Sequence, residues 1–287
     1  PDDAFTADTL GTERGGNAAL INSDGLVVTI GYLITEAETI WLFDSQGRAV
    51  PGHVVGYDQE TGFGLVQALQ KLVIPPFELG SSDSLRAGDP VILAGCGGVE
   101  HAVAAEVVSR REFAGYWEYM LDNAIFTTPP HPLWGGSALI GSDGTLRGIG
   151  SLYVQQSTDG KEPIDVNMVV PIDILKPILE ELLRYGKTNK PPRPWLGMFT
   201  TEVDGRVVVA GVADNGPAQQ ADVQLGDIIL GVGGQPIDDM VQMYRKIWSQ
   251  GPAGAEIPLN LQRSGDVVEV HVQSINRGAL LKGPQLH

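Results

Sequence analysis

The sequence predicts an all-β sandwich or barrel followed by a smaller α+β unit, and three features carry this prediction. From Ala18 to Ile149, short apolar runs alternate with turns built from Ser, Asp and Gly. A polar, proline-rich stretch, 186–194, then interrupts the pattern. Beyond it, short strand-like runs surround a single helix-like run. We therefore place the first domain at 1–186, a linker at 187–194 and the second domain at 195–287.

The apolar runs of the first domain are rich in β-branched residues and too short for helices. The clearest of these predicted strands are 26–30, 39–43 and 90–94. One helix is predicted after them, beginning near Pro171 and Asp173, with apolar residues at helical spacing up to a final Gly186. In the second domain, the sequence predicts strands at 207–212, 227–232, 257–262 and 267–272 and a helix over 238–248.

Composition excludes several classes of protein. The chain has 43% hydrophobic and 19% charged residues, the balance of an ordinary soluble globular protein. Its apolar runs stop short of the roughly 18 residues that a membrane helix needs. With 19 Lys and Arg against 35 Asp and Glu, the net charge of −16 repels phosphate backbones, so nucleic acid is not an expected partner.

The single cysteine, Cys96, permits no internal disulfide, and its apolar surroundings predict a buried structural thiol. The five histidines do not show metal-ligand spacing, so neither a metal nor another cofactor is expected. The sequence begins with Pro1 rather than Met, which leads us to expect that an export signal precedes it and is removed.

The start of the second domain carries a glycine at a position suited to binding a carboxylate. In Trp195-Leu196-Gly197-Met198, Gly197 lets main-chain N–H groups turn toward a ligand unobstructed by a side chain. Together with the glycine-rich turns and the helix downstream, this loop resembles that of a bacterial PDZ domain. The resemblance implies that a partner's C-terminal carboxylate binds the N–H groups of Leu196, Gly197 and Met198.

In the resembling family, the other wall of the peptide groove is the helix that follows. Here the corresponding side chains are Met240, Val241 and Tyr244. The alternative interpretation is that these three residues form the core-facing stripe of an amphipathic helix.

Three segments of the first domain resemble the HtrA/Deg family of serine proteases. They are 16–32, 54–66 and 131–140. The resemblance implies an all-β chymotrypsin-like double β-barrel followed by a small α+β PDZ domain. At the family's triad positions, however, the sequence has Tyr32 for the histidine, Gly62 for the aspartate, and Trp134 or Gly135 for the serine.

These residues do not supply the chemistry of peptide-bond hydrolysis. A serine hydroxyl needs a base to take its proton, and the base needs an acceptor to orient it. Tyr32 is a phenol with a pKa near 10 and has no second nitrogen. Gly62 has no side chain, and Trp134 offers only an N–H donor. In one register the oxyanion-hole position is Pro132, which has no N–H, and in the other it is Leu133. We therefore expect a degenerate protease that is not an enzyme.

Two further interpretations concern the same loop. Ser137 follows two glycines and has His131 nearby in sequence, which makes it a rival nucleophile, although the preferred interpretation is a small residue tolerated beside a tight turn. The bulky Tyr32 and Trp134 lead us to expect that aromatic rings face one another and fill the former cleft. The alternative is drift in a scaffold released from catalysis.

The sequence thus predicts a pseudoprotease whose PDZ domain binds peptide or protein C-termini or extended segments. The resemblance implies a scaffold, chaperone-like or regulatory role in protein quality control, in the periplasm or another extracytoplasmic space. A second copy of the chain and active relatives are further candidate partners. Two alternatives stay open: a serine endopeptidase or hydrolase acting through Ser137, and a purely structural subunit of an oligomer.

Overall fold

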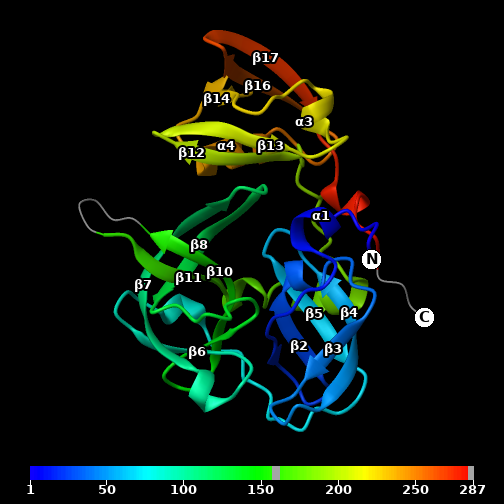
Figure 1. Ribbon diagram of the computed structural model, residues 1–287, viewed down its shortest axis with the longest axis vertical. Helices are drawn as coiled ribbons and strands as arrows, with labels where there is room; N and C mark the ends of the chain where they lie inside the picture. The colour runs from blue at the N-terminus through cyan, green and yellow to red at the C-terminus, as the bar shows by residue number, and fades with distance from the viewer. Residues whose placement is uncertain (157–161, 284–287) are drawn as a thin grey trace. The chain divides into compact units, whose positions relative to one another are not determined.

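The structure is a computed structural model that describes residues 1–156 and 162–283. The chain forms two compact units (Figure 1). The first unit contains residues 1–111, 122–189 and the segment that begins at Lys282, and the second contains 112–121 and 190–281. Residues 112–121 therefore group with the second unit, although they precede the predicted linker. The predicted domain boundaries remain a prediction.

The first unit is built from two β layers that lie side by side (Figure 1). One is an open five-stranded sheet in the order β1-β2-β5-β4-β3, and the other is a closed barrel in the order β10-β11-β8-β7-β6-β9. The open sheet contains β1 (Ala19–Leu20), β2 (Leu26–Ile30), β3 (Ile40–Phe43), β4 (Ala49–Tyr57) and β5 (Phe63–Ala68). The barrel contains β6 (Pro90–Ala94), β7 (Val103–Gly115), β8 (Tyr119–Thr128), β9 (Ala138–Ile140), β10 (Leu146–Gln156) and β11 (Ile164–Pro171).

Each layer of the first unit encloses its own apolar core. All five residues of β2 are buried, and β2 pairs antiparallel with β5 so that Val28 lies opposite Leu65. In the barrel, Val107, Leu139 and Val169 belong to one fully buried cluster. Because apolar side chains at these strand positions are removed from water, the alternation of apolar runs and turns in the sequence was sufficient to predict the β layers.

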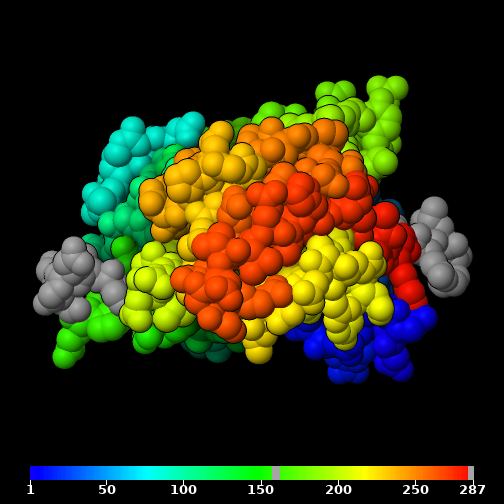
Figure 2. All heavy atoms as spheres, turned by 90° about the horizontal axis from the view of Figure 1, so that it is seen from above, coloured from blue at the N-terminus to red at the C-terminus, as the bar shows by residue number. Residues whose placement is uncertain are grey.

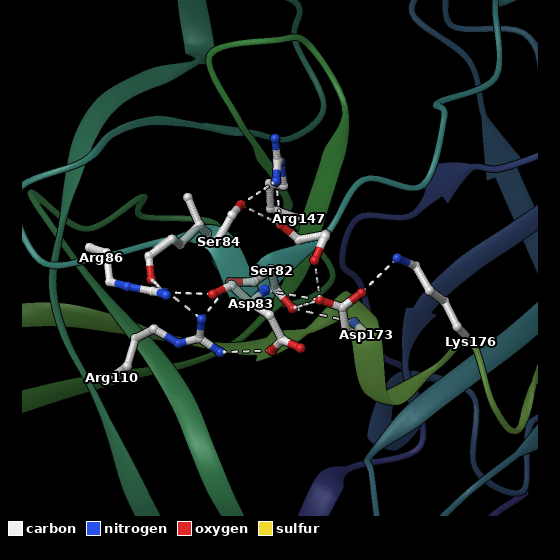
Figure 3. A network of polar contacts seen from close by, with 10 residues as sticks. Ser82, Asp83, Ser84, Arg86, Arg110, Arg147, Asp173 and Lys176 are labelled. Atoms are coloured by element: carbon white, nitrogen blue, oxygen red, sulfur yellow. Dashed lines mark hydrogen bonds and ion pairs between the residues drawn. The ribbon is translucent and has the colours of Figure 1, made fainter.

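A partly buried carboxylate anchors the segment that enters β6 (Figure 3). Asp173, just after β11, accepts hydrogen bonds from Ser81 Oγ at 2.9 Å, Ser82 Oγ at 3.0 Å and the Asp83 main-chain N–H at 2.9 Å. Lys176 Nζ donates to its other oxygen at 2.6 Å. Burial alone raises the pKa of Asp173, but these donors outweigh it and hold the pKa well below its ordinary value.

The helix of the first unit begins later than the sequence predicts. A short turn of 3-10 helix covers Ile172–Ile174, and the α-helix α2 covers only Leu179–Tyr185. Pro177 explains the difference, because it disfavours the helical conformation at the residue before it and lacks an N–H. The end was predicted correctly: Gly186 caps the helix in the left-handed conformation with a φ of 70°. A four-residue helix, α1 (Ala7–Leu10), precedes the first sheet.

The second unit is an antiparallel sheet with helices. The sheet has the order β12-β13-β14-β16-β17, with β15 paired to β14. Its strands are β12 (Met198–Val203), β13 (Arg206–Val212), β14 (Ile228–Val232), β15 (Gln235–Pro236), β16 (Glu256–Arg263) and β17 (Asp266–Gln273). The space-filling view shows the face on which β16 and β17, in orange, lie (Figure 2). β12 is an edge strand, so one row of its main-chain groups is not paired within the sheet.

Two helices accompany this sheet, α3 (Pro217–Gln220) and α4 (Met240–Ser249). The side chain of Asp239 caps α4 by accepting from the Gln242 N–H at 2.7 Å, the interaction expected of an aspartate at this position. The predicted helix 238–248 and the four predicted strands agree with the structure to within two residues at each end. Over the described part of the chain, none of the helices combines the length and the apolar character that crossing a membrane requires.

Candidate functional site

The loop 134–137 at the predicted nucleophile position is a tight turn closed by main-chain hydrogen bonds. The Ser137 N–H donates to Trp134 O at 3.0 Å, and the Gly136 N–H donates to Gly150 O at 2.8 Å. Gly136 has a φ of 78°, and a Cβ at this position would overlap the main-chain oxygen of Asn17. The loop therefore requires glycine at 136 for both its backbone angle and its close packing.

Asn17 holds this loop from the other side. Its main-chain N–H and its side-chain Nδ2 both donate to Gly135 O, at 2.8 and 3.2 Å, and Nδ2 also donates to Leu133 O at 2.7 Å. Its Oδ1 accepts from the Cys96 N–H at 2.8 Å. The sequence analysis missed Asn17, because its role depends on partners almost 80 and 120 residues away.

The rival nucleophile Ser137 is fully buried and hydrogen-bonded to the main chain. Its Oγ donates to Trp134 O at 2.9 Å. His131 is also buried: its Nδ1 accepts from the Leu133 N–H at 3.0 Å, and its Nε2 lies 2.8 Å from His101 O. Because a carbonyl oxygen can only accept, Nε2 must carry the proton, and neither ring nitrogen is left to take a proton from Ser137.

Tyr32 lies next to the turn, in the short 3-10 segment Gly31–Leu33 that follows β2. Its hydroxyl donates to Ser151 O at 2.8 Å. Burial raises the pKa of Tyr32 to about 12, and a side-chain hydrogen bond with Trp134 lowers it by less. A hydroxyl with this pKa stays protonated at neutral pH and cannot act as a general base.

The Tyr32 hydroxyl also occupies the space that a side chain at position 135 would need. A Cβ added to Gly135 would lie 2.9 Å from Tyr32 Oη. Trp134 is 36% exposed and packs its ring on Tyr153, with 5.6 Å between the ring centroids. Tyr32 and Trp134 share a side-chain hydrogen bond, whereas the ring contact of Trp134 is with Tyr153. A cavity of about 310 Å³ in this unit is lined by neighbouring residues such as Leu33 and not by either aromatic residue.

Gly62 lies beside Tyr32 in space, as the triad positions of the resembling family imply. The Gly31 N–H donates to Gly62 O at 2.6 Å, and Gly62 has a φ of 83°. The nearby carboxylate in the sequence is Asp58, which is buried and accepts from both the N–H and the hydroxyl of Thr61 at 2.8 Å. Asp58 therefore closes its own turn instead of orienting a base.

In the second unit, three main-chain N–H groups converge on one carboxylate. The N–H groups of Leu196, Gly197 and Met198 donate to Glu118 Oε1 at 3.1, 2.7 and 3.0 Å, and Leu196 also donates to Oε2 at 3.0 Å. Gly197 has a φ of 74°, which aligns the three donors. The N–H of Trp195 does not join these three donors, because it donates to Ile275 O at 3.0 Å.

Glu118 comes from residues 112–121, which belong to the second unit, and the sequence analysis missed it. Burial raises the pKa of Glu118 to about 7, although the three N–H donors and the charge of Arg277 lower it. The only local signal was a run of aromatic residues around it, because the partners of its carboxylate lie 78 to 80 residues further along the chain.

The predicted groove residues of α4 are mostly core residues. Met240 and Tyr244 are buried in the core of the second unit, and Val241 packs against that core while partly exposed. Tyr244 nonetheless places its hydroxyl 2.8 Å from Gly115 O, to which it donates. The alternative interpretation, a core-facing stripe, therefore describes Met240, whereas Tyr244 serves both the core and the groove.

The two remaining features from the sequence are the single cysteine and the search for metal ligands. Cys96 is exposed, so the prediction of a buried thiol was wrong; it lies in a loop after β6, and its N–H donates to the Asn17 side chain. Within residues 1–156 and 162–283, no three His, Cys, Asp or Glu side chains are grouped so that they could hold a metal ion.

Two domain families match the chain. Residues 16–149 match the trypsin-like peptidase domain, and residues 194–273 match the PDZ domain. The serine protease Do-like HtrA of Lactobacillus helveticus is 25% identical over 277 residues, covering 88% of this chain and 65% of that protein. The periplasmic serine endoprotease DegP of Escherichia coli K12 is 26% identical over 273 residues, covering 90% of this chain and 56% of that protein. The chain thus spans about half to two thirds of the length of these relatives.

Solved structures show the same fold. The HtrA-type protease AlgW, solved with a decapeptide, aligns with a TM-score of 0.54 at 21% identity and covers 94% of this chain and 83% of that chain. The serine endoprotease from Yersinia pestis aligns with a TM-score of 0.52 at 22% identity and covers 91% and 88%. The predicted chymotrypsin-like β fold followed by a PDZ domain is thereby confirmed. The chain resembles the HtrA and DegP proteases in combining a match to the trypsin-like peptidase domain with a match to the PDZ domain.

Proposed function

We propose that this chain binds the C-terminal ends of peptides or proteins through its PDZ groove and does not hydrolyse peptide bonds. The observation that carries the binding half is the convergence of the Leu196, Gly197 and Met198 N–H groups on one carboxylate oxygen. Such a cluster of donors is a strong site for a carboxylate, because hydrogen bonds to an ionised acceptor are about twice as strong as neutral ones.

The non-catalytic half rests on the residues at the triad positions. Tyr32 holds its proton and donates it to a main-chain oxygen, Gly62 has no side chain, and Gly135 has none either. Trp134 carries an N–H donor and no nucleophilic oxygen. In this proposal the Tyr32 hydroxyl fills the space of the missing serine side chain, which plugs the former cleft.

The biological role follows from the relatives and is part of the proposal. Curated relatives include periplasmic serine endoproteases, which supports an extracytoplasmic location. The chain then acts as a scaffold, a chaperone-like holder or a regulator in protein quality control. Its partners are C-termini or unfolded segments of other proteins, and a second copy of the chain or an active relative is a further candidate.

The rival function is peptide-bond hydrolysis through Ser137, and the names of the relatives, which are serine endoproteases, favour it. The surroundings of Ser137 argue against it. The side chain is fully buried, its hydroxyl is committed to Trp134 O, and both ring nitrogens of His131 have main-chain partners. A nucleophile needs a free base within hydrogen-bonding reach.

A screen of random C-terminal decapeptides against the whole chain tests the binding half. Each selected peptide is synthesised with a free C-terminal carboxylate and with a C-terminal amide, and both dissociation constants are measured by fluorescence anisotropy. We expect the amide to bind about 10-fold or more weakly, because it loses the charge-assisted bonds to the three N–H groups. Equal affinity of the two forms, or no selected peptide, contradicts the proposal.

A further inference from the structure

Residues 112–121, the tip of the β7–β8 hairpin, pack against the loop at 196–198, β12 and α4 of the second unit. They follow the residues of β7 that belong to the first unit and precede those of β8, yet they pack with the second unit. Met120 belongs to the core of that unit and is 7% exposed. The aromatic ring of Tyr116 lies 6.3 Å from that of Phe199 on β12, measured between centroids. The segment is therefore packed against the second unit over several residues.

The carboxylate of Glu118 takes the place of a terminal carboxylate. Its Oε1 accepts from all three N–H groups of the loop, with the shortest bond, 2.7 Å, to Gly197. Glu118 itself has a φ of 60°, a left-handed conformation that is uncommon for residues other than glycine. This angle turns the chain onward to Tyr119 while the side chain points at the loop. An internal residue thereby presents a carboxylate where a chain end would.

Tyr116, two residues before Glu118, is hydrogen-bonded to the edge strand of the sheet. The Thr200 N–H of β12 donates to Tyr116 O at 3.1 Å. The Met198 N–H, two residues earlier on the chain, donates to the Glu118 side chain. Residues 116–118 form the turn between β7 and β8, and this turn therefore meets the outer edge of β12 through one main-chain and one side-chain group.

The helix side of the groove binds the same segment through one hydroxyl. Tyr244 Oη of α4 donates to Gly115 O at 2.8 Å and accepts from the Glu118 N–H at 3.3 Å. It also lies 3.1 Å from Thr200 Oγ1. Main-chain groups on both sides of the segment are therefore satisfied, as they are for a peptide held between a strand and a helix.

We propose that residues 116–118 are a built-in ligand of this PDZ groove, and that a partner's C-terminus binds by displacing them. The inference rests on the proposed function of the groove as a C-terminus binding site. It follows from the contacts because the three N–H groups that hold Glu118 cannot at the same time hold a second carboxylate. The groove is therefore regulated by its own chain.

Because an external peptide must first displace residues 116–118, its apparent affinity for the groove is lowered. A site that is free only for a fraction of the time has a dissociation constant raised by the inverse of that fraction. Because the segment is tethered, its effective concentration is of the order of millimolar, which favours the occupied state. Removing the Glu118 carboxylate should therefore lower the dissociation constant by about 10-fold or more.

The test compares four proteins: the whole wild-type chain, Glu118→Ala, Glu118→Asn and Glu112→Ala. Asparagine suits the left-handed backbone at 118 but is neutral and too short to reach the loop, so it guards against a folding defect in the alanine variant. Glu112 lies in the same segment and is paired with Arg245 of α4, so its removal is a matched loss of one charge. The probe is the tightest fluorescein-labelled decapeptide from the C-terminus screen.

We expect both Glu118 variants to bind the probe at least 10-fold more tightly than the wild type, and Glu112→Ala to bind within 2-fold of it. A second readout needs no peptide: amide hydrogen exchange at Leu196, Gly197 and Met198 should be faster in the Glu118 variants, because their N–H groups lose an acceptor.

The outcomes separate the two proposals. If the variants bind like the wild type and exchange is unchanged, the built-in ligand is overturned, while peptide binding stands. If no protein binds any peptide, the proposed function fails, and displacement by a partner fails with it, even where faster exchange shows that the carboxylate was docked.

Discussion

Gly136→Ala is expected to lower the free energy of unfolding by about 3 kcal/mol. An added methyl group would overlap the main-chain oxygen of Asn17, and main chain cannot move aside as the end of a flexible side chain can. Asn17 is held by Thr29, whose Oγ1 donates to that same oxygen at 2.6 Å, so relief of the overlap would break further bonds. Urea unfolding of the purified variant and wild type measures the difference.

Gly144→Ala is the matched control for this prediction. Gly144 has a φ of 80°, nearly the 78° of Gly136, but a Cβ at this position meets no atom within 4 Å. The left-handed backbone alone should therefore cost about 1 kcal/mol. Equal losses for the two variants would mean that the contact with Asn17 does not fix the loop, which would contradict the account of the nucleophile-like turn.

Asp173→Ala is expected to lower the free energy of unfolding by about 2 to 4 kcal/mol at pH 7. The carboxylate accepts four hydrogen bonds in the network of Figure 3. Its removal leaves the buried Ser82 hydroxyl and the Asp83 N–H without their acceptor. Urea unfolding at pH 7 checks the value, with Asp143→Ala as the control because Asp143 is an exposed carboxylate paired with Arg147.

The effect of Asp173 should depend on pH in a defined direction. Its pKa is lowered in the folded protein, so its contribution is complete above the ordinary pKa near 4 and is lost as pH falls toward the lowered value. The difference between wild type and Asp173→Ala should therefore shrink below pH 4. A difference that stays constant down to the acid limit of folding would exclude the charged network as the cause.

Much of the fold could be predicted from the sequence, because local apolar patterning determines it. The strand β2 and the strand β6 have the predicted bounds, and Gly186 ends the helix where the sequence predicts. The helix α2 was predicted too long, since the periodicity was followed across Pro177. The long strands β7 and β8 were not predicted, because polar and aromatic residues interrupt their apolar alternation.

The candidate sites also contain some residues that the sequence could predict and others that it could not. The residues Tyr32, Gly62 and Gly135 could be aligned by motif, and the structure brings them together around one turn. The hydroxyl of Tyr32 against Gly135 could not be predicted, because it depends on side-chain packing between distant segments. Glu118 was missed for the same reason: nothing in its neighbourhood in the sequence indicates that its carboxylate meets the loop beginning at Leu196.

The barrel and the PDZ groove are consistent with one function, binding without hydrolysis. In the proposed function, the barrel keeps its packed turns, such as the one at Gly136, although the side chains that perform hydrolysis are absent. The PDZ groove keeps its three donors and holds a carboxylate of its own chain. A protein of this kind can recognise the ends of other chains without cutting them.

The rate at which the purified chain cleaves fluorescein-labelled casein, measured beside that of Ser137→Ala, tests the absence of hydrolysis most directly. We expect both proteins to release fluorescence at the rate of buffer alone, because the described site offers no free base next to a hydroxyl. Cleavage by the wild type that Ser137→Ala abolishes would contradict the account.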